Sequence, residues 1–436
     1  MSSKRVAVLG AAAFFGLASG FAWGGTFNKL VGTGTAVPGQ ATNFTNVNLA
    51  GVDGTFGAAF IGNFSLNATN YSGLYRYQNG QVTTLADRGT TGPAGETINS
   101  IIANGDYENG GIVFAANTTL GPTLYRYTPG QPQPLAALVR QGDVLPGSTA
   151  AVGTFFNRGV GGDANEFAFR TTRNDGSNGM YQSVSGFGMQ IVDDKTRSGV
   201  AEMGNFVDFP ELHFRDGKTA FVGTGRDPDD INAAPEPAGV FVAMPGNPFQ
   251  LIAGRNMIIP NAHDDGERFN EFERPRILPD GRVGFAGGFI EEEGPNVGEH
   301  HMGVWIRNPD LTWKIYIDSD MHLQGLHADI EEFNQYSVES GVNFFGVNDE
   351  DGGSYIYYES SEGVFTHLID TYETLDGKSM SSIRMLADTA IGSEVFFRVN
   401  FTDGTSGVYS ASVPEPASLS LIGAASAALL ARRRRD

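Results

Sequence analysis

The chain has 436 residues, of which 18% are charged and 11% aromatic; 59 are glycine and none is cysteine. Its net charge of −20 argues against a nucleic-acid partner, because binding a polyanion requires clustered lysine and arginine. The lack of cysteine excludes disulfides, thiolate metal sites and a cysteine nucleophile. Many glycines and aromatic residues with few charges are typical of a turn-rich β-protein.

The N-terminal segment has the composition of a secretory signal peptide. Lys4 and Arg5 precede an apolar run, Val6 to Ala22, interrupted only by glycine and serine. A basic start followed by an apolar stretch defines such peptides, and we assign residues 1–25 to it. The first 22 residues carry two positive charges and no acid, and the last 24 carry four arginines against two acids. The body between them therefore has a net charge of −24.

Residues 40 to 412 contain a phrase ending in phenylalanine that recurs seven times, at steps of 52–64 residues. The seven copies are Gly57–Phe60, Gly111–Phe114, Glu166–Phe169, Lys218–Phe221, Arg282–Phe285, Val342–Phe345 and Glu394–Phe397. A second phrase follows each copy: Gly73–Tyr75, Thr123–Tyr125, Gly179–Tyr181, Gly239–Phe241, Gly303–Trp305, Ser354–Ile356 and Gly407–Tyr409. A third phrase ends most units, as in Thr84–Gly89, Ala137–Gly142 and Leu251–Gly254. Apolar phrases of this length between turn residues predict strands.

Asp-Gly dipeptides mark the joins between phrases. The dipeptides at these joins are Asp53-Gly54, Asp175-Gly176, Asp216-Gly217, Asp280-Gly281, Asp351-Gly352 and Asp403-Gly404. Because this dipeptide accommodates the positive φ of tight hairpin turns, each unit reads as about four antiparallel strands. Units of this size must stack to bury both faces, and four-stranded units arranged radially make a β-propeller. The sequence therefore predicts an all-β domain over residues 26–412, a seven-bladed propeller.

The seventh unit stops at Ser412 and lacks the third phrase. A matching phrase lies at the front of the body: Lys29–Gly39 shares its leading aliphatic residues, central glycine and final Pro-Gly with Ala137–Gly147. We therefore predict that an N-terminal strand completes the last blade and closes the ring, leaving no open sheet edge. A strand near Tyr409 that did not pair with residues 28 to 33 would contradict this prediction.

Acidic turns provide metal candidates, and the candidate calcium ligands are Asp318, Asp320, Asp349 and Asp351. Calcium prefers several oxygen ligands, but the EF-hand pattern fails at Val347 and Tyr358. The one adjacent histidine pair, His300-His301, is a poor chelator because neighbouring strand residues point to opposite faces. Solvated turn residues are the better explanation of the acids, so we expect no cofactor, with calcium as the open alternative.

Neither a G-x-S-x-G nor an H-E-x-x-H motif is present, and most acids lie in turns. An active site assembled from several blades at the channel mouth remains the alternative, because glycoside hydrolysis needs only a suitable pair of carboxylates. We therefore predict no catalytic residues and no enzyme activity. Two carboxylates, or a histidine with a carboxylate, in one cleft would favour the alternative.

The C-terminus has three consecutive parts. Pro414-Glu415-Pro416 precedes an apolar run, residues 417–431, and a basic cluster, Arg432, Arg433, Arg434 and Arg435. The run is shorter than the ~20 residues of an ordinary spanning helix, and the arginines would hold its end on the cytoplasmic side. Residues 413–436 resemble the PEP-CTERM sorting signal of bacteria that make exopolysaccharide. The resemblance implies an exosortase-type processing enzyme as partner and a short helix in the inner membrane before processing.

The body is also similar to tandem-repeat families of secreted bacterial proteins, for which Asp216–Phe221 is the nearest phrase. These resemblances imply an exported protein at the cell surface or in the extracellular matrix. We expect a non-enzymatic binding or adhesion propeller associated with exopolysaccharide or biofilm. The alternative is a matrix-directed polysaccharide hydrolase or lyase whose site lies at the channel mouth.

Overall fold

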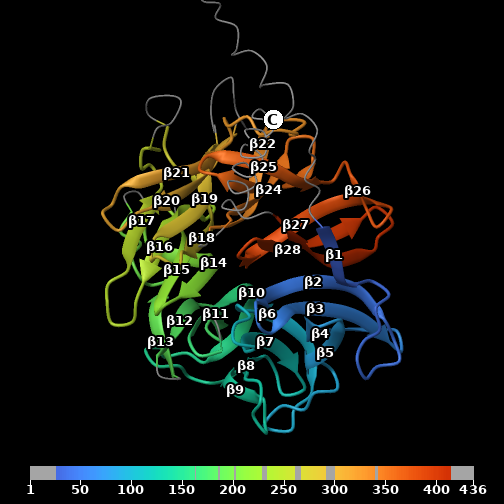
Figure 1. Cartoon of the computed structure of the whole chain (residues 1–436). Helices are drawn as coiled ribbons and strands as arrows, with labels where there is room; N and C mark the ends of the chain where they lie inside the picture. Colours follow the sequence, from blue (N-terminus) through green and yellow to red (C-terminus); the bar gives the residue numbers. More distant parts are fainter. Residues whose placement is uncertain are drawn as a thin grey trace, which may run out of the picture.

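The computed structural model describes residues 26–162, 164–184, 187–200, 203–227, 233–260, 267–290, 300–338 and 342–413. Within these ranges the elements are 29 β-strands. They form seven antiparallel sheets arranged radially around a central axis (Figure 1). The all-β, seven-bladed propeller predicted from the repeated phrases is therefore confirmed.

Blades 1 to 6 each contain four strands, paired in sequence order from the axis to the rim (Figure 1). Blade 1 has β2 (Phe44–Asp53), β3 (Gly57–Leu66), β4 (Thr69–Gln78) and β5 (Gln81–Ala86). Blade 2 has β6 (Ile98–Asn104), β7 (Ile112–Thr118), β8 (Thr123–Tyr127) and β9 (Leu135–Arg140). Blade 3 has β10 (Val152–Gly162), β11 (Phe167–Arg173), β12 (Asn178–Val184) and β13 (Phe187–Asp193).

The next three blades repeat this order. Blade 4 has β14 (Phe206–Arg215), β15 (Lys218–Gly225), β16 (Glu236–Ala243) and β17 (Gln250–Gly254). Blade 5 has β18 (Glu271–Ile277), β19 (Val283–Ile290), β20 (His300–Arg307) and β21 (Trp313–Asp318). Blade 6 has β22 (Ile330–Ser337), β23 (Phe344–Asp349), β24 (Ser354–Ser361) and β25 (Val364–Asp370).

Blade 7 joins the two ends of the domain. Its strands are β26 (Thr374–Leu375), β27 (Lys378–Ile391), β28 (Glu394–Phe401), β29 (Ser406–Ser412) and β1 (Thr26–Gly32). The N-terminal β1 pairs antiparallel with β29, with Lys29 opposite Tyr409 and Val31 opposite Val408. The predicted closure by an N-terminal strand is therefore confirmed. The short β26 is an addition to the four predicted strands.

One aromatic pair recurs between the second and third strands of every blade. The pairs are Phe60–Tyr75, Phe114–Tyr125, Phe169–Tyr181, Phe221–Phe241, Phe285–Trp305, Phe345–Tyr357 and Phe397–Tyr409. All are at most 3% exposed. In blade 6 the partner is Tyr357, which lies just past the phrase Ser354–Ile356 in the same strand. The recurring phenylalanine of the sequence is therefore the inner half of this buried pair.

The hydrophobic core lies between blades. Seven clusters of buried side chains occur in the described residues, and each joins two neighbouring blades. One of them packs Phe396 and Val408 of blade 7 against Phe44 and Phe60 of blade 1. Because every blade shares its apolar faces with both neighbours, the ring is closed by packing as well as by strand pairing.

Five of the six Asp-Gly joins have the expected positive φ at glycine, from 71° at Gly217 to 83° at Gly176. The exception is Asp53-Gly54, where Gly57 has the positive φ of 84° instead. There Asp53 accepts hydrogen bonds from the backbone N–H groups of Thr55 and Phe56, at 2.8 and 2.9 Å. This first join is therefore a longer capped turn.

The predicted signal peptide (1–25), sorting motif (414–416), helix (417–431) and arginine cluster (432–435) lie outside the described residues. Within the described part, no helix has the length and hydrophobicity needed to cross a membrane.

Candidate functional site

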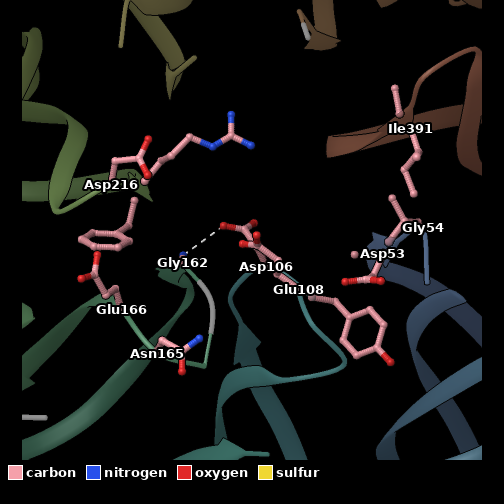
Figure 2. A pocket seen from close by; sticks show the side chains of 15 residues that line it. Asp53, Gly54, Asp106, Glu108, Gly162, Asn165, Glu166, Asp216 and Ile391 are labelled. Carbon is pink, nitrogen blue, oxygen red and sulfur yellow. Dashed lines mark hydrogen bonds between the residues drawn. The ribbon is translucent and has the colours of Figure 1, made fainter. Parts of the chain in front are cut away.

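Turns from several blades converge on a cavity of about 480 Å³ around the axis. These turns join the first and second strands of blades 1, 2, 3, 4 and 7. The acidic residues that line the cavity are Asp53, Asp106, Glu108, Glu166 and Asp216. Figure 2 shows Asp106 and Glu108 reaching into its centre, with Asp53 approaching from the neighbouring turn. We call this cavity the acidic mouth.

Two carboxylates of the acidic mouth also link neighbouring blades. Asp53 of blade 1 accepts a hydrogen bond from the N–H of Asn109 in blade 2, at 2.6 Å. Asp106 of blade 2 accepts one from the N–H of Gly162 in blade 3, at 3.0 Å, drawn as a dashed line in Figure 2. Since a carboxylate bound to backbone donors has a fixed orientation, these two acids form the rigid part of the mouth.

A second cavity, of about 180 Å³, adjoins the acidic mouth at Asp106 and is lined by the first strands of the blades. Its basic residues are Arg158, Arg274, Arg276 and Arg384, with Glu211 among them. We call it the arginine chamber. A basic interior is unexpected in a body whose net charge is −24.

Bulges in the first strands place these arginines. Strand pairing shifts register between Phe155 and Val160 in blade 3 and between Glu273 and Arg276 in blade 5. Arg158 and Arg274 lie within these two shifts and have positive φ values, 59° and 50°. Non-glycine residues adopt such values rarely, and they concentrate at functional sites. A bulge re-aims the side chain that it carries.

Two of the four arginines have carboxylate partners. Arg158 pairs with Glu211 at 3.0 Å. Arg274 pairs with Glu273 and Glu332, and its guanidinium donates to the carbonyl oxygen of Phe333. Burial raises the pKa of the Glu273 carboxyl, against the opposing effect of Arg274. The backbone N–H of Arg274 also donates to the Glu211 carboxylate, at 2.6 Å, so these contacts form one network that connects blades 3, 4, 5 and 6.

Three arginines near the chamber have no carboxylate ion pair within the described residues: Arg276, Arg384 and Arg398. Arg276 donates to the amide oxygen of Gln335 at 3.2 Å, and Arg398 donates to that of Asn46 at 3.1 Å. The Nε atoms of both are buried without a hydrogen-bond partner. Burial lowers the pKa of Arg384, and the positive charges of Arg158 and Arg274 lower it further. The chamber therefore holds a surplus of positive charge suited to an anionic group.

The one histidine of the chamber has a structural contact. His213 is 2% exposed, and its Nδ1 accepts a hydrogen bond from the N–H of Ile277 in the next blade, at 3.1 Å. The site as a whole thus combines hydrogen-bond acceptors at the mouth with guanidinium donors behind them.

The four calcium candidates do not come together. Asp349 is fully buried and accepts hydrogen bonds from Gly353 N, at 2.6 Å, and from the Tyr355 hydroxyl. Burial and the neighbouring Asp320 raise the pKa of Asp318, while Asp351 is exposed in a turn. In the described part, none of the four belongs to a group of three ligand atoms within 4.8 Å of one another. Calcium binding therefore stays the open alternative to the expectation of no cofactor.

The sequence predicted a possible site at the channel mouth but assigned no residue to it; Asp53 and Asp216 were named only as turn residues. The arginines and carboxylates lie on seven blades, so no spacing along the chain links them. A usable pattern is the presence of charged residues such as Arg274 and Arg384 between apolar phrases, at the position of each innermost strand.

Solved structures that are similar in shape include the following three. The β-propeller domain of the Trilobed protease from Pyrococcus furiosus is 9% identical, covering 85% of this chain and 97% of its own, with a TM-score of 0.48. The tricorn protease is 10% identical, covering 84% of this chain and 33% of its own, with a TM-score of 0.47. An ulvan lyase of polysaccharide lyase family PL25 is 11% identical, covering 81% of this chain and 89% of its own, with a TM-score of 0.41. The fold assignment rests on this chain's own strand pairing.

Sequence models identify two segments, and no curated protein matches the chain. Residues 412–435 match the PEP-CTERM protein-sorting motif. The chain is therefore an exported, surface-targeted protein that an exosortase processes, as its tail predicted. Residues 11–338 match a model described as "Family of unknown function (DUF7453)". Since this match spans most of the propeller, the chain belongs to the DUF7453 family.

Proposed function

We propose that this exported propeller is a non-enzymatic binding protein for an extracellular polysaccharide, which it holds at the acidic mouth and arginine chamber. The guanidinium groups of the chamber that have no carboxylate ion pair within the described residues carry the proposal. Guanidinium groups recognise carboxylates in a planar, two-bond geometry. The carboxylates of the mouth accept hydrogen bonds from sugar hydroxyls. The mouth alone has the volume of an ordinary ligand site.

The arrangement of carboxylates at the mouth and arginines in the chamber determines which ligand is preferred. Five carboxylates at the entrance repel a densely anionic chain, whereas a hydroxyl-rich chain passes them without an electrostatic penalty. A single acidic sugar at the chain end then meets Arg276 and Arg384 inside. The preferred ligand is accordingly a mostly neutral glycan with an acidic terminal unit.

Binding to a glycan array and calorimetry test the proposal. We expect glycans with a terminal uronic acid to bind more tightly than their neutral counterparts. Arg384→Gln should weaken the acidic glycan about tenfold or more, because a charge-assisted pair contributes about 1.5–3 kcal/mol. Arg88→Gln is the matched control, since Arg88 lies over the Tyr71 ring outside both cavities. Equal affinities for acidic and neutral glycans would refute the assignment of the chamber.

A glycan-active enzyme is the second candidate, favoured by the gathering of several carboxylates at one mouth. Such pairs act as general acid and base or nucleophile in glycoside hydrolysis. The same glycans distinguish the two functions. Release of reducing ends or unsaturated products, abolished by Glu108→Gln or Glu166→Gln, would establish the enzyme. Saturable binding without product supports the binding protein.

The final location of the protein is also part of the proposal: release into the matrix, or attachment at the cell surface, after cleavage of the tail. Fractionation of the native host with the full chain and with residues 413–436 deleted tests it. We expect the full chain at the surface or in the matrix, with a lower mass after processing. Unchanged location and mass after deletion would contradict this role of the tail.

A further inference from the structure

The turn after the fourth strand repeats from blade to blade, and the register identifies its equivalent positions. In blade 1, Thr84 lies opposite the core residue Tyr75. In blade 6, His367 lies opposite the core residue Tyr357. The residues three and six positions later are Asp87 and Thr90 in blade 1, and Asp370 and Glu373 in blade 6. Blade 6 thus has histidine and glutamate where blade 1 has two threonines.

In four other blades the last of these positions caps the turn. Its side chain accepts a hydrogen bond from the backbone N–H three residues earlier. The pairs are Thr35–Gly32 at 3.2 Å, Thr90–Asp87 at 2.9 Å, Asp143–Arg140 at 2.7 Å and Thr196–Asp193 at 3.2 Å. Within the described contacts, Glu373 makes no such bond. Its carboxylate instead lies with the His367 imidazole and the Asp370 carboxylate, in a group whose ligand atoms are all within 4.8 Å of one another.

The two inner groups are held in place by their surroundings. Asp370 is 6% exposed, and its Oδ1 accepts hydrogen bonds from the N–H groups of Tyr372 and Glu373, at 2.7 and 3.0 Å. The rings of Tyr355 and Tyr357 pack edge-on against the His367 imidazole, with centroids 6.4 and 5.6 Å away. Such neighbouring contacts orient metal ligands.

The inner contact has the spacing of two ligands on one ion. His367 Nε2 and Asp370 Oδ2 form an ion pair at 3.1 Å, and the buried Nε2 makes no hydrogen bond of regular geometry. Two atoms each about 2.1 Å from one metal ion, at an angle between the octahedral and tetrahedral values, lie about 3.0–3.4 Å apart. Glu373 is the more exposed third group, and burial and the Asp370 carboxylate both raise its pKa.

A buried hydroxyl gives a second, independent indication. Tyr357 is 0% exposed, and its hydroxyl has no hydrogen-bond partner. In blade 1 the equivalent Tyr75 donates to Asp87 at 3.3 Å. The Asp370 carboxylate is close enough to raise the pKa of the Tyr357 phenol, which burial raises most. A water on a metal ion beside Asp370 would give this hydroxyl a hydrogen-bond partner.

We propose that His367, Asp370 and Glu373 bind a divalent transition-metal ion of the Zn²⁺ type at the end of β25. One imidazole nitrogen and two carboxylate oxygens suit such an ion, whereas calcium takes oxygen ligands throughout. Three protein ligands leave a position for water. The ion would tie β25 to the turn that leads into blade 7. The site lies apart from the acidic mouth and arginine chamber and is independent of the proposed function.

Calorimetry on the purified, chelator-treated full-length protein tests the site with ZnCl₂ as the probe and CaCl₂ for comparison. We expect one saturable Zn²⁺ site, a melting temperature that rises with Zn²⁺, and no comparable calcium response. The double variant His367→Thr with Glu373→Thr gives blade 6 the residues of blade 1, so its fold should persist, as circular dichroism will verify. Its Zn²⁺ affinity should fall at least tenfold, and its melting temperature should no longer respond.

His322→Thr is the matched control, because His322 is exposed and lines a different cavity. It should bind Zn²⁺ as the unaltered protein does. Two results would overturn the proposal: no saturable Zn²⁺ binding by the unaltered protein, or a folded double variant with unchanged affinity. Loss of Zn²⁺ binding in His322→Thr but not in the double variant would place the ion at other histidines and would also refute the proposal.

Discussion

Ring closure through β1 can be tested with a disulfide, because the chain has no cysteine of its own. Thr26 and Ser412 lie opposite each other at the end of the β1–β29 ladder, and both are exposed. A Thr26→Cys, Ser412→Cys variant would close a loop that contains the entire propeller. The chain-entropy relation then gives a stabilisation of about 6 kcal/mol for this loop length at 25 °C. Urea unfolding with and without reductant measures it.

A disulfide across a hairpin serves as the comparison for the stabilisation by the ring-closing disulfide. Ser65 and Asn70 face each other across the β3–β4 turn, and cysteines there would enclose only the turn. The same relation gives about 2 kcal/mol for so short a loop. We therefore expect the oxidised ring-closing variant to gain clearly more free energy of unfolding than the oxidised hairpin variant. The closure argument would be wrong if the first pair failed to oxidise in the native state, or if the two gains were equal.

Two further predictions concern the buried aromatic residues. Phe397→Ala should lower the free energy of unfolding by about 3–5 kcal/mol, whereas Val364→Ala, at a 52% exposed side chain, should change it by under about 0.5 kcal/mol; equal effects in urea would contradict the pairing. Burial raises the pKa of Tyr107 to about 12. The protonated phenol therefore contributes its full stabilisation below pH 10, and about 2–3 kcal/mol of the free energy of unfolding is lost as pH rises through 12. Tyr107→Phe should reduce this alkaline loss of stability. An unchanged dependence of the free energy of unfolding on pH would refute the assignment of the loss to Tyr107.

Whether a strand can be recognised in the sequence depends on whether its pairing with the neighbouring strand contains register shifts. The second and third strands pair without a shift in six of the seven blades, so apolar phrases such as Gly57–Phe60 and Gly73–Tyr75 keep their period. Every first strand contains register shifts, as between Leu49 and Gly51 in blade 1. A shift breaks the alternation of apolar and polar residues. The innermost strands therefore produced no recognisable phrase, although four strands per unit were correctly predicted.

The candidate sites were harder to predict than the fold for a related reason. Arg158, Arg276 and Arg384 belong to blades 3, 5 and 7, and only the closed ring brings them to one chamber. The proposed metal group is different, because His367, Asp370 and Glu373 lie at intervals of three residues. That spacing is uninformative for a strand and its turn until the repeat alignment sets His367 against Thr84. The sequence shows only one adjacent histidine pair, His300-His301, and it is not part of this group.

The repeat alignment also predicts that a metal site can be transferred between blades. Thr84→His with Thr90→Glu would place the proposed ligand types around Asp87 of blade 1, which has the same register position after the fourth strand as Asp370. The change removes the hydrogen bond from Asp87 N to Thr90 Oγ1, a loss of about 1 kcal/mol. Calorimetry should then give two Zn²⁺ sites per chain instead of one. A second site requires Tyr75 to release Asp87, so adding Tyr75→Phe should tighten it. If the altered blade folds and binds no Zn²⁺ with or without that change, ligand identity and register alone do not make the site in blade 6.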